Sequence, residues 1–194
     1  MTPTHIGVPP RFSAAVRTLH RFDWDSRISV GSLDPAASLA PHVAGLSAEI
    51  FSQGAQLASG RLILLHDPAG SEVWQGDFRC VTFAQAELAT DLVYDPLLAE
   101  VGWSWLMDAL DQAGASYTRE SGTITTTAST PFGTKKDEEP FSQIEVRASW
   151  TPLLPHEDGL ATHLDAWQGL LCHLGGIPIH ESVVAIGSRL APSH

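Results

Sequence analysis

Residues 59–88 read SGRLILLHDPAGSEVWQGDFRCVTFAQAEL, and this stretch decides the fold. Residues 61–65 form a short apolar run next to Gly60, which is typical of a strand that is buried on both faces. Residues 74–83 carry apolar side chains on both parities and predict a second interior strand. Between them, residues 67–70 have turn chemistry, because aspartate bonds the backbone two residues on and Gly70 accepts a positive φ. The stretch therefore predicts a central antiparallel hairpin.

Further elements are expected on both sides of this hairpin. Before it, an apolar stripe predicts a helix over residues 11–20, alternation predicts a strand from Ile28, and residues 42–51 favour a strand although their alanines also suit a helix. After it, the pattern predicts a helix over residues 95–112, two or three strands, and a helix over residues 160–174. This order predicts an α+β fold, with a mostly antiparallel sheet of about five to seven strands packed with three helices. We expect one globular domain over residues 1–178 and a peripheral tail over residues 179–194.

The helix expected over residues 95–112 has an unusually wide apolar arc. A helix that lies on one sheet needs an apolar stripe of roughly 100°, so this helix needs a second cover, either a terminal helix of the same chain or a second subunit. We expect a homodimer in which the second apolar side of the helix forms the interface, with the side chains of Trp103, Leu106, Met107 and Leu110. The alternative is a monomer in which the N-terminal helix covers that side.

Composition limits the classes of function. The net charge of −11, from 22 acidic and 11 basic side chains, argues against a nucleic-acid-binding protein. Between residues 67 and 111, Arg79 is the only base among many acids, which predicts either an acidic surface that aids solubility or one that binds a partner with a basic surface. Two distant cysteines and the lack of an apolar leader predict a cytoplasmic protein. No apolar stretch is long enough to span a membrane.

Signatures of chemistry are few. There is no HxH, HExxH or CxxC spacing, so we expect no metal and no cofactor, and there is no GxSxG either. His66 beside Asp67 resembles a base with its orienting carboxylate, but neighbours on a strand point to opposite faces, and an Asp-Pro corner is the simpler interpretation. The sequence therefore favours a binding protein over an enzyme and assigns no catalytic residue. The alternative is an enzyme or carrier with a small-molecule pocket near His66, Asp67, Trp74 and Arg79.

Six blocks carry a resemblance to a known family. In chain order they are GRLILLHDPAG, VWQGDFRCVTF, DPLLAEVGWSWLMDAL, SGTITTTAS, SQIEVRASWTP and DAWQGLLCHLGGIP. Their order and spacing resemble the actinobacterial family known as domain of unknown function 3000. The resemblance implies a cytoplasmic actinobacterial protein and brings no activity or catalytic residue. The element order alone also resembles type III secretion chaperones and their YbjN-like relatives, which implies a chaperone- or adaptor-like homodimer by analogy of fold.

Overall fold

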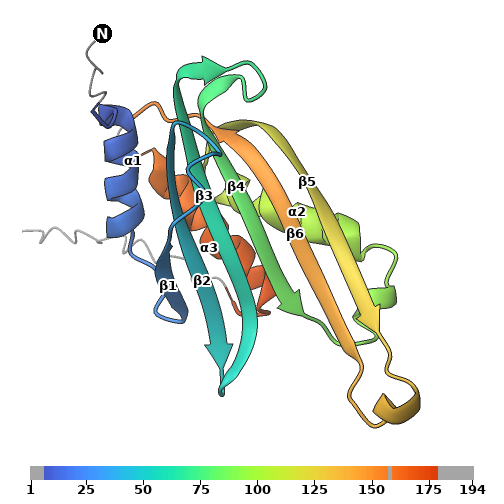
Figure 1. Cartoon of the computed structure of the whole chain (residues 1–194). Coiled ribbons are helices and arrows are strands. Elements are labelled where there is room, and N and C mark those ends of the chain that lie inside the picture. The colour runs from blue at the N-terminus through green and yellow to red at the C-terminus, as the bar shows by residue number, and fades with distance from the viewer. Residues whose placement is uncertain (1–6, 157–158, 179–194) are drawn as a thin grey trace, which may run out of the picture.

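The computed structural model describes residues 7–156 and 159–178, so the expected tail over residues 179–194 lies outside the described residues. The described chain forms one sheet with helices packed on one side (Figure 1). In chain order the elements are α1 (Pro10–Arg21), β1 (Ile28–Leu33), β2 (His42–Ser52), β3 (Ala55–Ser71), β4 (Gly76–Glu87), η1 (Leu92–Tyr94), α2 (Leu98–Gln112), β5 (Tyr117–Ser129), η2 (Gly133–Lys135), β6 (Phe141–Pro152) and α3 (Leu160–Leu174). The predicted α+β class is confirmed, and residues 42–51 form a strand as expected.

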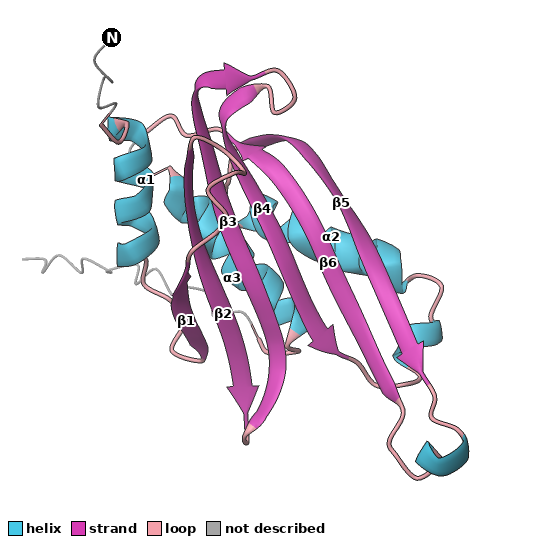
Figure 2. Cartoon of the chain, in the orientation of Figure 1, coloured by secondary structure: helices cyan, strands magenta, loops and turns pink. Residues whose placement is uncertain are grey.

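The sheet is antiparallel throughout, with the strand order β1-β2-β3-β4-β6-β5. The predicted hairpin supplies the two central strands, β3 and β4. After β4 the chain crosses the sheet as α2, enters the edge strand β5 and returns as β6, which pairs with β4 (Figure 2). This crossover places α2 under β5 and β6, and it leaves β1 and β5 as the two edges.

The chain reverses later than the sequence predicted. β3 continues through residues 67–70, and the turn consists of residues 72–75. The pairing register shifts across residues 67–70, so this segment bulges out of the strand. The expected turn chemistry is present, since Asp67 Oδ1 accepts a hydrogen bond from the Ala69 amide at 3.0 Å and Gly70 has φ +77. The prediction of a turn at these residues is wrong, because the long pairing of β3 with β4 turns a local corner into a bulge.

Both covers of α2 belong to the chain itself. On one side the sheet approaches closely at Gly102, where an added Cβ would lie 2.9 Å from Ile144 Cδ1. On the other side α3 packs along α2 (Figure 1). Leu106 and Leu110 are 0% exposed as a result. A terminal helix of the same chain is therefore the second cover, but it is the C-terminal helix and not the N-terminal helix of the monomer alternative.

Two buried tryptophans fasten α3 to the sheet. Trp167 of α3 donates from Nε1 to Thr82 Oγ1 of β4 at 2.8 Å. Trp150 of β6 donates from Nε1 to Nδ1 of His163 on α3 at 3.1 Å. Gly60 of β3 makes room for this packing, because an added Cβ would lie 3.2 Å from the Trp167 ring. The polar atoms of these large side chains are thus satisfied inside the core, as burial requires.

The sheet has one face under the helices and one face without them. Gly60 and Ile144 lie against the helix layer. Side chains alternate along a strand, so Arg61, one residue after Gly60, and Arg147, three residues after Ile144, point away from it. No helix of the described residues lies on this second face (Figure 1). We call it the helix-free face. Its central members are Arg61, Ile63, Leu65, Arg79, Val81, Phe83, Gln85, Ser121, Thr123, Thr125, Glu145, Arg147, Ser149 and Thr151.

Candidate functional site

The structure does not bring the four expected pocket residues together. His66 pairs with Phe78 on the helix side of the sheet, whereas Arg79, the next residue of β4, lies on the helix-free face. Asp67 lies in the bulge, and Trp74 lies in the turn after β3. His66 and Arg79 therefore line no common pocket, because neighbouring positions on paired strands point to opposite faces of the sheet.

His66 is a packed histidine in this fold. It is 2% exposed, and its ring stacks on Phe78 with a centroid distance of 4.2 Å. Its Nδ1 lies 3.1 Å from the Asp77 carbonyl oxygen, while Nε2 is buried and has no hydrogen-bond partner among the described residues. Burial is the main cause that lowers the pKa of His66, so the ring is neutral near pH 7. The structure gives this side chain no open approach for a substrate.

The expected interface residues divide into buried and accessible members. Leu106 and Leu110 are covered by the chain's own α3, so this fold offers neither of them to a partner. Trp103 and Met107 are half-buried at the surface of α2. The Met107 sulfur lies 4.0 Å from the Tyr117 hydroxyl of β5. A homodimer stays a prediction, and Trp103 and Met107 are the members of the expected set that could form its contacts.

The helix-free face carries an open, largely apolar hollow. Its volume is about 640 Å³, and it lies over β3, β4, β6 and β5. Half-buried Ile63, Val81 and Phe83 form its apolar floor, and exposed Arg61 and Arg147 belong to its lining. The sequence showed these apolar residues but predicted that both faces of the hairpin are covered. The helices of the described residues cover one face, and the apolar residues of the other face line the hollow.

Cations gather on this face of an otherwise acidic chain. Arg61, Arg79 and Arg147 come from three adjacent strands, in a sequence with 11 basic and 22 acidic side chains. Arg147 Nε contacts Glu145 Oε1 at 2.6 Å, and its guanidinium lies 5.5 Å from the centroid of the Phe83 ring. Exposed Arg61 has no ion-pair partner among the residues that the structure describes. The hollow is therefore locally positive.

Arg79 is a buried cation that is held by hydroxyl and carbonyl oxygens. It is 8% exposed. Its Nη1 donates to the Arg119 carbonyl oxygen at 2.8 Å and to Thr151 Oγ1 at 3.0 Å. Its Nη2 donates to Ser149 Oγ at 2.7 Å and to Ser121 Oγ at 3.2 Å. Burial is the main cause that lowers the pKa of Arg79, yet arginine stays charged in proteins. All four acceptors of its hydrogen bonds are thus neutral oxygens.

The geometry of the described residues sets two limits on the site. Among residues 7–156 and 159–178, no group of three or more His, Cys, Asp or Glu side chains is placed to hold a metal ion. No helix in these ranges combines the length and the apolar character that crossing a membrane requires. The candidate site on the helix-free face combines an apolar floor, a positive rim and the buried Arg79.

A known protein family matches this chain over most of its length. No curated protein and no solved structure matches the chain. The model of the family described as "Protein of unknown function (DUF3000)" matches residues 8–184. This range contains all six blocks that carried the resemblance, together with the whole sheet and the three helices. The chain belongs to the DUF3000 family.

Proposed function

We propose that this chain is a binding protein that docks an acidic, partly apolar polypeptide segment on its helix-free face. The hollow carries the proposal, because half-buried Ile63, Val81 and Phe83 lie there between Arg61 and Arg147. Aromatic residues and arginine are enriched where proteins bind one another, and large apolar groups that helices leave uncovered often mark such surfaces. A cytoplasmic, adaptor-like role in an actinobacterial cell is part of the proposal.

The charge of the hollow favours an acidic partner over a basic one. Glu145 is engaged by Arg147, which leaves Arg61 and the buried Arg79 without a carboxylate ligand among the described residues. The acids between residues 67 and 111 supported a basic partner, but several of them have partners within the chain. These are Asp67 with the Ala69 amide, Asp77 with Arg11, Asp95 with the Leu97 amide, and Asp111 with the Tyr117 hydroxyl.

A second copy fits the hollow less well than an acidic segment. In a two-fold dimer the same surface lies on both sides of the interface, so the positive patch of Arg61, Arg79 and Arg147 would face the same positive patch of the partner. Each copy also carries a net charge of −11. Self-association through Trp103 and Met107 is a separate prediction. Size-exclusion chromatography with light scattering tests it, since a monomer has a mass of 20.8 kDa.

Selection of peptides from a random display library on the immobilised full chain tests the proposed function. We expect enriched peptides to carry Asp or Glu next to a large apolar residue. We expect the charge reversals Arg61→Glu and Arg147→Glu, combined, to weaken binding of a selected peptide by about tenfold or more, because each exposed charge pair contributes up to about 1 kcal/mol and reversal adds repulsion. Fluorescence anisotropy of the labelled peptide measures this change.

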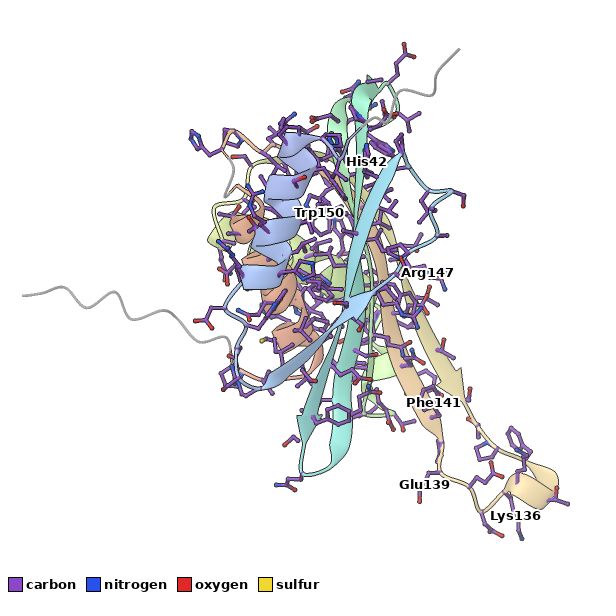
Figure 3. All side chains as sticks on the ribbon, turned by 60° about the vertical axis from the view of Figure 1, so that its left-hand side comes forward. His42, Lys136, Glu139, Phe141, Arg147 and Trp150 are labelled. Atoms are coloured by element: carbon purple, nitrogen blue, oxygen red, sulfur yellow. The ribbon has the colours of Figure 1, made fainter. Side chains whose placement is uncertain are left out.

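The matched control reverses two charges elsewhere. Lys135→Glu and Lys136→Glu change the net charge equally, and Lys136 lies on the loop at the far end of the molecule from Arg147 (Figure 3). We expect this control to bind the peptide with nearly the affinity of the wild type. Enrichment of basic peptides, or an equal loss of affinity in both double variants, would contradict the proposal.

A further inference from the structure

The hollow contains a preorganised group of donors where β5 meets β6. We infer that Ser121 and Ser149, polarised by the buried guanidinium of Arg79, form a subsite for one oxyanion group, a carboxylate or a phosphate, of the bound ligand. The inference rests on the proposed function in that the docked segment would carry this group. The subsite itself is a property of three side chains and has its own test.

The first step concerns the charge of Arg79. A buried cation is costly unless an opposite charge or several hydrogen bonds compensate it. Arg79 has four hydrogen bonds, and none of their acceptors is a carboxylate. Glu120 acts on Arg79 electrostatically, but it is exposed and accepts none of these bonds. A positive charge thus lies just beneath the hollow, and an anion above it would supply the missing counter-charge.

The second step concerns the direction of the hydroxyl groups. Ser121 Oγ and Ser149 Oγ both accept from Arg79 Nη2, and the two oxygens lie 3.4 Å apart. A hydroxyl that accepts a hydrogen bond still has its own proton to donate. If one serine donates to the other, the proton of the second serine remains for another acceptor. Both serines line the hollow, so this proton is available to an acceptor atom of a ligand that enters it.

The third step concerns the class of acceptor. Hydrogen bonds to a charged oxygen are shorter and stronger than those to a neutral one, and donors that are themselves polarised by a cation strengthen them further. Arg147 and the Thr123 hydroxyl line the same hollow and add donors beside the serines. A lysine or arginine of a ligand would be repelled at this position. The chemistry therefore selects an oxyanion.

The test uses inorganic phosphate and, in a second arm, acetate, added to the full chain at constant ionic strength. Amide chemical shifts in ¹H–¹⁵N correlation spectra report binding. We expect saturable shifts at Ser121, Gly122 and Ser149 with at least one of the two anions, and the arm with the tighter binding identifies phosphate or carboxylate as the preferred group. Combined Ser121→Ala and Ser149→Ala should weaken this binding by about tenfold or more, since hydrogen bonds to charged groups are stronger than those between neutral groups.

Thr125→Ala is the matched control, because it removes an exposed hydroxyl from the same strand and the same face. We expect it to bind the anion as the wild type does. Shifts that do not saturate with either anion, or equal affinity in the double serine variant, would overturn the subsite. A third outcome separates the two proposals. If phosphate or acetate binds, but Arg61→Glu and Arg147→Glu leave the affinity for the selected peptides unchanged, the proposed function is refuted and the subsite is not.

Discussion

Replacing Trp167 by alanine should lower the free energy of unfolding by about 3–5 kcal/mol, the range for removal of a large aromatic side chain from a core. The ring is fully buried, and it meets Trp24 edge-on at a centroid distance of 5.7 Å. The substitution would also leave Thr82 Oγ1 without the donor that now satisfies it. Urea unfolding followed by circular dichroism measures the loss.

Two further variants separate the causes of this loss. Trp105→Ala removes a half-buried ring that stacks on His173 of α3, and we expect it to cost less than half as much. Thr82→Val keeps the Trp167 ring but leaves its indole N–H without an acceptor. This change should lower the free energy of unfolding by about 1–3 kcal/mol. A loss in Trp167→Ala no larger than that in Trp105→Ala would contradict the packing of α3 on β3 and β4.

Acidification should destabilise the fold between about pH 6.5 and pH 4. His163 is fully buried, and burial lowers its pKa to about 4, against about 6.5 in an unfolded chain. Above pH 6.5 both states are neutral at this residue and no stability is lost. As the pH falls from there to about 4, the unfolded state takes up a proton that the folded state does not, so the free energy of unfolding falls by up to about 3 kcal/mol. His66 also has a lowered pKa and acts in the same direction.

Unfolding free energies measured across this pH range test the prediction. His163→Gln retains an oxygen that can accept from Trp150 Nε1 and removes the titrating group. The fall in stability of this variant should be shallower than that of the wild type, with His66 supplying the remainder. The control is His156→Gln, which removes an exposed histidine. An unchanged slope in His163→Gln would show that the neutral, buried imidazole is not what acid disrupts.

Periodicity predicted the long elements because each one buries a stripe or a face that the sequence displays directly. It could not place the reversal of the central hairpin, because residues 67–70 have the same local chemistry in a turn and in a bulge. The length over which β4 pairs with β3 decides between the two, and that length is not local. The wide apolar arc of α2 similarly showed that a second cover exists. It did not identify the cover, since α3 of the same chain and a second subunit would bury Leu106 and Leu110 equally well.

The candidate site was less visible in the sequence. Ile63, Val81 and Phe83 indicated an interior strand. They form the floor of a hollow because the helices of residues 7–156 and 159–178 lie on the opposite face. An arginine within an apolar strand, as Arg79 is, is a usable signal of a polar site. Its partners could not be predicted, because the serine and threonine hydroxyls come from β5 and β6, 42 to 72 residues further along the chain.

The central claim is that the partner binds on the helix-free face and not on the helix layer. Methyl spectra of the isotopically labelled full chain, titrated with a display-selected acidic peptide, test it directly, because the two faces carry the same residue type. The account predicts that the methyl signals of Ile63 and Val81 shift and saturate, while those of Ile50 and Ile144 beneath the helices stay in place. Saturating shifts at Ile50 or Ile144, with Ile63 and Val81 unmoved, would contradict it.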